Sequence, residues 1–150
     1  MPEGFELKKS THLKKFKVNG LHTQHALPSG YVIGEYKGVR RSVRAADEKR
    51  SAREYMMDVR GPNGVYVIDA GNQKNSSFIR YSNAANNDSK QNARFVQRQY
   101  RIYLVTTRPI PAGREILTWY GKDTQGVIDG YKVRGGKGKR NSRRLRKLKP

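Results

Sequence analysis

The residues that could do chemistry gather between Tyr66 and Gly121, where short apolar runs are separated by long polar segments rich in Asn and Ser. Such a composition buries a core inefficiently, and irregular backbone of this kind usually carries a binding or catalytic site. We therefore expect the functional site in this stretch, with Tyr120 as its chemical centre.

A second chemical feature is the run of cations at the C-terminus. Residues 131–150 contain ten Lys or Arg and no acid, within a chain of net charge +20. With no apolar period, this tail is expected to be disordered when free and to bind nucleic-acid phosphates without reading sequence. It also looks like a nuclear localisation signal. The cations expected to contact nucleic acid are Lys137, Lys139, Arg140, Arg143, Arg144, Arg146, Lys147 and Lys149.

The remaining candidates are three histidines and two basic runs: His12, His22 and His25, Lys14-Lys15, and Arg40-Arg41 with Arg44. The histidines have no acidic or cysteine partner at ligand spacing, and the chain has no Cys, so we predict no metal site. The basic runs could be solvated faces or could extend a nucleic-acid footprint, and the sequence leaves both readings open.

Length and composition bound the class of protein. A chain of 150 residues with 35% hydrophobic content and a mean hydropathy of −0.92 fits one domain with a modest core. No segment approaches the roughly 20 apolar residues of a membrane span, and the start has no apolar signal-peptide core. We expect a soluble, intracellular protein that is not secreted.

Short β-type runs separated by turns predict a mostly β domain. The expected strands cover residues 13–23, 31–36, 56–59, 65–68, 93–97, 100–106 and 115–120, with a short strand or turn over 126–133. Tight turns are expected at Asn19-Gly20 and at Gly61–Gly64, and a thin surface helix over roughly Val43 to Met56. The predicted organisation is a polar lead-in over 1–12, a domain over 13–133 and the basic tail over 134–150.

An ordered series of motifs resembles the SET-domain family of protein lysine methyltransferases, and its PR branch most closely. The motifs are Asn19-Gly20-Leu21, Leu27–Gly38 with its E-Y-x-G ending, Ile68-Asp69-Ala70, Gly71-Asn72, Phe78–Ala84, Gln91-Asn92, Ile110–Ile116 and Trp119-Tyr120-Gly121. Each motif is short, and their order and spacing over residues 13–122 carry the resemblance.

The resemblance implies a β-clip fold of the SET type. In this fold small curled sheets form a pseudoknot, and the loop at Arg80–Asn87 is tucked beneath the closing segment. It also implies that S-adenosylmethionine binds on one face while the target lysine enters a tunnel from the other. Ordered polar loops then become understandable, because threading and ligand contacts satisfy their backbone groups.

Catalytic and tunnel residues follow from the same resemblance. Tyr120 stands at the position of the family's catalytic tyrosine, and Tyr36 at a tunnel-lining position of E-Y-x-G. Tyr103 and Trp119 are the further tunnel candidates. Each of these aromatic residues could instead be ordinary packing, with Tyr120 a buried tyrosine whose hydroxyl is satisfied.

The resemblance also assigns the cofactor site, with three departures from the family pattern. The cofactor-binding candidates are Val18, Asn19, Gly20, Arg80, Tyr81, Asn83 and Ala84. Val18 stands where the family has the first glycine of G-x-G, and Arg80-Tyr81 stands where it has N-H. No cysteine cluster follows Gly121, so a zinc-bound lid is not expected.

The predicted function is transfer of a methyl group from S-adenosylmethionine to a lysine, on histones in chromatin, in the nucleus. The basic tail would hold DNA or the nucleosome. The alternative is a catalytically inactive PR-like module that binds DNA or protein. The sequence does not indicate an oligomeric state.

Overall fold

A computed structural model describes residues 1–48, 55–85, 88–118, 127–128 and 131–132 of the chain. The strands are β1 (Phe5–Lys9), β2 (Asn19–Thr23), β3 (Val32–Glu35), β4 (Val39–Ser42), β5 (Met56–Gly61), β6 (Gly64–Asp69), β7 (Asn83–Ala84), β8 (Ala93–Arg98), β9 (Arg101–Thr106), β10 (Leu117–Thr118), β11 (Val127–Ile128) and β12 (Tyr131–Lys132). The helical elements are α1 (Val43–Glu48) and the 3-10 turns η1 (Lys14–Phe16), η3 (Gln73–Asn75), η4 (Phe78–Tyr81) and η5 (Asp88–Lys90). The prediction of a mostly β domain is confirmed.

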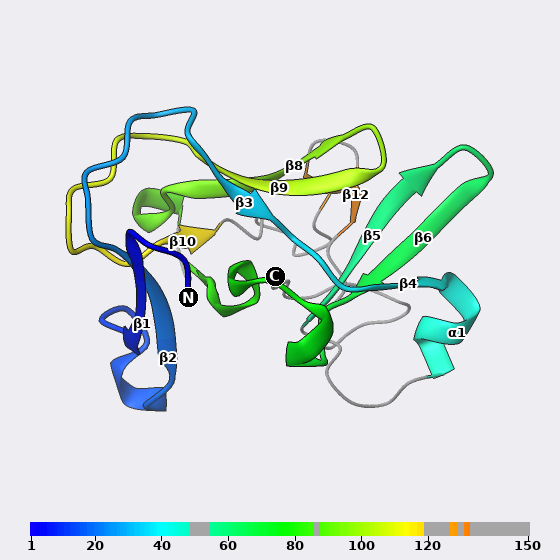
Figure 1. The fold of residues 1–150 in the computed structure, drawn as a ribbon, viewed down its shortest axis with the longest axis horizontal. Coiled ribbons are helices and arrows are strands. Elements are labelled where there is room, and N and C mark those ends of the chain that lie inside the picture. The colour runs from blue at the N-terminus through cyan, green and yellow to red at the C-terminus, as the bar shows by residue number, and fades with distance from the viewer. Residues whose placement is uncertain (49–54, 86–87, 119–126, 129–130, 133–150) are drawn as a thin grey trace.

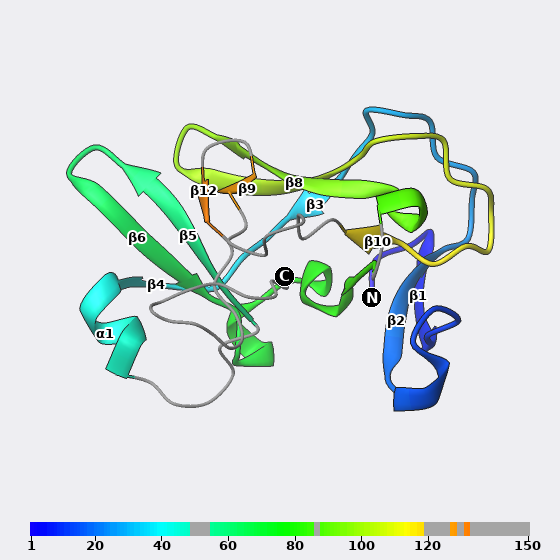
Figure 2. The same ribbon diagram turned by 180° about the vertical axis from the view of Figure 1, so that it is seen from behind.

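The strands form small sheets arranged along the molecule. The β1–β2 pair lies at one end, the sheet of order β4-β6-β5 lies at the other, and the sheet of order β3-β9-β8-β10-β7 lies between them (Figures 1 and 2). In the end sheet, β5 and β6 pair through the predicted tight turn, with Gly61 opposite Gly64. Gly64 has a φ of +126°, which residues other than glycine rarely adopt.

The five-stranded sheet contains the threading that the family resemblance implies. β8 and β9 form the predicted antiparallel hairpin, whereas β10 runs parallel to both β7 and β8 and lies between them. Leu117 and Thr118 pair with Asn83 and Ala84 on one side, and Thr118 pairs with Ala93 on the other. A segment late in the chain is therefore inserted between two strands that precede it.

One main core joins these sheets. Its fully buried residues come from most of the strands, and its members include Leu21, Ile33, Tyr36, Met57, Ile68, Ile79, Phe95, Ile102, Leu104, Ile110 and Ile116. Tyr36 and Phe95 meet edge to face, with ring centroids 5.6 Å apart and an interplanar angle of 82°. Such aromatic pairs add to the stability that apolar burial gives.

The N-terminal segment differs from the expectation in two places. The expected polar lead-in contains β1, which pairs along its whole length with β2. Asn19 and Gly20 are not a turn but the first residues of β2, opposite Lys9 and Lys8. The reversal is made instead by η1, which ends at Lys17 in the left-handed region with a φ of 53°. The outer limits of the domain stay a prediction.

The predicted helix is wrong at its C-terminal end. α1 covers Val43–Glu48, and Met56, the last residue assigned to the helix, begins β5 instead. The side chains of Met56 and Val67 pack with Ala46 of α1 in a second, smaller apolar cluster. The helix is therefore anchored to the end sheet through few apolar side chains.

Candidate active site

Three segments that are far apart in the sequence meet at the side chain of Asn83. Its Nδ2 donates to the carbonyl oxygen of Asn19 and to Oε2 of Glu115, at 3.0 Å in each case. The backbone of Asn83 pairs with Leu117 of β10. The start of β2, the β7 strand and residues 115–118 therefore lie side by side, and the first two contain the cofactor-site candidates Asn19, Gly20, Asn83 and Ala84.

Glu115 holds this junction together, and sequence reasoning missed it. Its carboxylate is buried and accepts hydrogen bonds from the Ser10 hydroxyl, 2.9 Å from both oxygens, and from the Thr11 amide at 2.9 Å. The Thr11 hydroxyl and the His12 amide add bonds of 3.2 Å, and Asn83 adds its own. Charge-assisted bonds of this kind are about twice as strong as neutral ones. An acidic residue directly before the apolar pair Ile116-Leu117 was the available signal.

Gly20 has to be a glycine because of this carboxylate. A Cβ at position 20 would lie 2.1 Å from Oε2 of Glu115 and 2.8 Å from its Cδ. The Gly20 carbonyl accepts a hydrogen bond from Nδ1 of the buried His22 at 3.0 Å. The close approach of β2 to Glu115 therefore depends on the missing side chain.

Val18 and Asn19 offer different groups to a ligand. The Val18 carbonyl accepts from the Ser10 amide at 2.8 Å, and its side chain is exposed. The Asn19 carbonyl is taken by Asn83, whereas the Asn19 side chain is exposed. The side-chain amide of Asn19 is thus exposed at the start of β2 and could bind a ligand.

Arg80 and Tyr81 lie in η4, which packs against both β2 and β3. The buried Arg80 guanidinium donates from Nε to the Ala70 carbonyl at 2.9 Å and from Nη2 to the Gly71 carbonyl at 3.1 Å. Its centre lies 4.1 Å from the centroid of the Tyr55 ring and 5.1 Å from that of Tyr81. Arg80 therefore ties η4 to the segment that follows β6, with two aromatic rings stacked around it.

Tyr36 directly follows β3, and Tyr103 lies on the neighbouring strand β9 of the central sheet. Tyr36 is buried directly after β3, and its hydroxyl donates to the Tyr55 carbonyl at 2.6 Å. Tyr103 is partly buried in β9, opposite Glu35. The structure thus places these two candidates on or directly after adjacent strands and gives the Tyr36 hydroxyl an internal partner.

Asn92 closes the seam on the other side of β10. Its Nδ2 donates to the Glu115 carbonyl at 3.0 Å, and its Oδ1 accepts from the Leu117 amide at 2.8 Å. Its own amide donates to the Leu117 carbonyl at 2.9 Å. A single asparagine side chain and its backbone therefore fix the register of the closing segment.

Several predicted site residues lie outside the described part of the chain. These are Trp119, Tyr120 and the tail cations from Lys137 to Lys149. The described range 88–118 ends directly before Trp119 and Tyr120. Within the described residues, no group of three His, Cys, Asp or Glu side chains is placed to hold a metal ion. None of the described helices has the length and apolar character to cross a membrane.

Small sheets with a strand threaded between β7 and β8 define a class that known structures share. The methyltransferase domain of human PR domain-containing protein 2 superposes with a TM-score of 0.67 and 27% identity, covering 82% of this chain and 81% of that one. The fold is therefore of the SET/PR type, as predicted. A family model, that of the PR domain of PR domain zinc finger protein 2, matches residues 6–129. The chain belongs to this PR-domain family.

Curated relatives show the same kinship at lower coverage. Histone-lysine N-methyltransferase set-17 of Caenorhabditis elegans is 28% identical over 102 residues, which is 68% of this chain and 36% of that protein. Human histone-lysine N-methyltransferase PRDM7 is 28% identical over 97 residues, 65% of this chain and 19% of that protein. The chain thus spans about a third or less of the length of these relatives, and its family includes proteins named as histone-lysine methyltransferases.

Proposed function

We propose that this chain is a protein lysine methyltransferase domain that uses S-adenosylmethionine and acts on histone lysines. The observation that carries the proposal is the junction of Asn19-Gly20, Asn83-Ala84 and Glu115–Thr118 around one asparagine side chain. Relatives named as histone-lysine methyltransferases support it at the level of the family.

The residues at the junction fit an S-adenosylmethionine site. The exposed Asn19 amide, the small half-buried Ala84 and the half-buried Tyr81 lie on segments that pack together. They offer hydrogen-bonding groups for a charged amino-acid end and an aromatic face for a purine. The bound cofactor would supply an electrophilic methyl group on a sulfonium.

The chain's own task is to deliver a neutral amine in line with that methyl group. A free lysine has a pKa of about 10.4, so the site has to favour its deprotonated form, which an apolar tunnel does by removing water. We assign the tunnel walls to Tyr36, Tyr103 and Trp119, and the position next to the transferring methyl to the Tyr120 hydroxyl. Orientation in such a tunnel supplies much of the rate acceleration.

The charge of the chain favours chromatin as the place of action. A chain of net charge +20 repels free cationic histone tails, whereas nucleosomal DNA would attract it. We assign DNA binding to the basic tail and location to the nucleus. Methylation is then expected to be faster on nucleosomes than on free histones.

A second candidate is a PR-type module that binds DNA or protein without transferring a methyl group. Arg80 favours it, because its guanidinium is committed to the carbonyls of Ala70 and Gly71 and leaves no donor at Nε for a ligand. The two candidates differ in one measurable property, the affinity for S-adenosylmethionine.

Calorimetry with S-adenosylmethionine, followed by mass spectrometry of nucleosomes and free histones after incubation with it, tests the proposal. Methyltransferase function predicts saturable binding and a mass gain of one or more methyl groups on a histone lysine. Tyr120→Phe should lower the rate by about a hundredfold while leaving the melting temperature within error. Full activity in this variant would remove Tyr120 from the mechanism, and no binding at millimolar cofactor would leave the second candidate.

Tyr36→Phe separates a role in the tunnel from a role in packing. The variant loses the hydrogen bond from the hydroxyl to the Tyr55 carbonyl, which costs about 1 kcal/mol of stability. A tunnel wall predicts that the rate or the KM for the peptide changes while the Kd for the cofactor does not. A fall in melting temperature with unchanged kinetics would assign Tyr36 to packing alone.

A further inference from the structure

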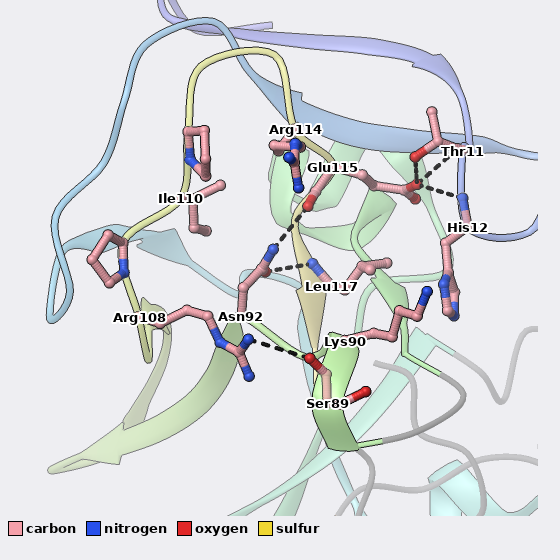
Figure 3. Close-up of a pocket in the computed structure, with 12 residues that line it drawn as sticks. Thr11, His12, Ser89, Lys90, Asn92, Arg108, Ile110, Arg114, Glu115 and Leu117 are labelled. Carbon is pink, nitrogen blue, oxygen red and sulfur yellow. Dashed lines mark hydrogen bonds between the residues drawn. The ribbon is translucent and has the colours of Figure 1, made fainter.

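A cavity of about 440 Å³ lies beside the Glu115 junction, and no role above uses its cationic lining. Its walls come from the segment after β1, from η5 and from the loop between β9 and β10. Figure 3 shows Arg114 next to Glu115, Arg108 with its guanidinium turned toward Ser89, and Lys90 and His12 on another side of this basic pocket. Residues distant in sequence thus bring several cationic side chains to one opening.

Three cations of the basic pocket are not held by an acid of the described part of the chain. Among the residues that the structure describes, no ion pair joins Lys90, Arg108 or Arg114 to a carboxylate. Arg108 donates from Nη1 to the Ser89 carbonyl at 3.2 Å, which uses one of its five N–H groups. All three side chains are exposed, so they keep charge and donors for a ligand.

Glu115 is the acidic residue in the wall, and both of its carboxylate oxygens accept hydrogen bonds from neutral donors. Its side chain runs toward Thr11 and His12, where Oε1 accepts the bonds described above (Figure 3). Its remaining partners are Ser10 and Asn83. The neutral donors on the far wall hold the carboxylate, and among the described residues it forms no ion pair with the arginines at the opening.

The chemistry of this opening matches phosphate. Guanidinium groups bind phosphate oxygens bidentately, and Arg108 and Arg114 both line a cavity of about 440 Å³. The lining residues Thr11 and His12 lead directly into η1, where Lys14, Lys15 and Lys17 are exposed. The positive surface therefore continues beyond the pocket, as a linear polyanion requires and a small ligand does not.

We infer that the basic pocket is a phosphate-binding site for the nucleic-acid backbone, formed by Lys90, Arg108 and Arg114 and extended by the lysines around η1. It would be a structured contact, separate from the basic tail, and it does not depend on methyl transfer. Contacts of this kind position a protein on a duplex without reading its sequence. Nucleic acid would then be held by the body of the domain as well as by its tail.

Fluorescence anisotropy of a labelled DNA duplex over a series of KCl concentrations tests the inference on the full chain. The double variant Arg108→Gln/Arg114→Gln is compared with the control Arg98→Gln/Lys74→Gln, which removes the same charge from exposed positions outside the basic pocket. The slope of log K against log salt is negative, and loss of two phosphate contacts should reduce its magnitude by about 2. Binding near physiological salt should weaken about tenfold. The control should change the slope by well under 1.

Two outcomes would overturn the inference. Equal slopes for the two double variants would mean that only net charge matters and that the basic pocket makes no contact. Equal slopes, together with inorganic pyrophosphate binding that the pocket variant loses and the control variant keeps, would assign the pocket to a small phosphorylated ligand and not to a nucleic-acid strand. Calorimetry measures the pyrophosphate binding. Circular dichroism melts of both variants establish that neither effect comes from unfolding.

Discussion

Two basic regions of this domain carry similar numbers of cations and differ in what their carboxylates do. In the β4–α1 region, Arg41 pairs with the buried Asp69 at 2.8 Å, Arg44 pairs with Glu48 at 3.6 Å, and Arg40 donates to the Tyr100 carbonyl at 2.6 Å. In the basic pocket, Glu115 bonds neutral donors, and Lys90, Arg108 and Arg114 stay unpaired among the described residues.

The difference shows why a run of arginines is a poor guide to a binding surface. Arg40, Arg41 and Arg44 are close in sequence and look like a cluster, yet Arg41 and Arg44 each pair with a carboxylate of the domain. Cations in the basic pocket are spread over residues 90–114 and converge only through the fold. A charge contributes to binding an external anion only insofar as no internal partner has already taken it.

The largest effect is expected when the charge of the Glu115 carboxylate in the wall of the basic pocket is removed. Glu115→Gln replaces an acceptor-only group by one that presents an NH2 to a wall of donors. It should lower stability by about 3 kcal/mol, or roughly 6–12 °C in melting temperature for a domain of this size. Differential scanning calorimetry measures it.

Two controls accompany Glu115→Gln. Ser10→Ala removes one donor and should cost about 1 kcal/mol. Glu48→Gln changes a largely exposed carboxylate and should leave the melting temperature within error. A neutral Glu115→Gln would mean that the junction tolerates loss of the charge and that another group fixes the threading.

A smaller effect is expected at Asp69, where stability and DNA binding should move in opposite directions. Asp69→Asn keeps an oxygen for the Gly71 amide and removes the charge opposite Arg41, whose side chain is 30% exposed. The melting temperature should fall by the equivalent of about 1 kcal/mol. The negative slope of log K against log salt for DNA should increase in magnitude, by at most about 1, because Arg41 no longer pairs with a carboxylate and can contact a phosphate.

Arg41→Gln is the matched variant for this comparison. It should leave the slope unchanged, since the guanidinium that it removes is already neutralised by Asp69. If Arg41→Gln lowers the slope as much as Arg114→Gln does, internal pairing does not decide which cations bind DNA.

Local patterns allowed much of the β structure to be predicted. Gly-Pro-Asn-Gly between two apolar runs defines the β5–β6 hairpin, and the alternating runs of β8 and β9 define the next. β1 was missed because Phe5-Glu6-Leu7-Lys8-Lys9 has only two apolar residues and gains its stability by pairing with β2. The helix end was missed because Met56 packs into an apolar cluster as part of a strand. In both places tertiary contacts outweigh local propensity.

The site was predictable as a set of segments and not as a set of contacts. Motif order placed Asn19-Gly20 and Asn83-Ala84 in one site, and the structure brings them together. Nothing local indicates that Ser10 bonds a carboxylate 105 residues away, or that Arg80 turns inward to the carbonyls of Ala70 and Gly71. Such hydrogen bonds exist only after the chain is threaded, and the sequence therefore identifies Glu115 as an unexplained acid and no more.

The smallest effect is expected at Arg44, and it tests whether burial grades the internal pairing. Its partner Glu48 lies at 3.6 Å with both side chains largely exposed, at 90% and 71%, so the pair is screened by water and salt. Arg44→Gln should leave the melting temperature within error, and its DNA slope should fall by more than that of Arg41→Gln and by less than that of Arg114→Gln. Anisotropy titrations of the three single variants rank them directly. If Arg44→Gln and Arg41→Gln change the salt slope of DNA binding equally, an ion pair within the domain prevents a cation from contacting DNA whatever the exposure of the pair.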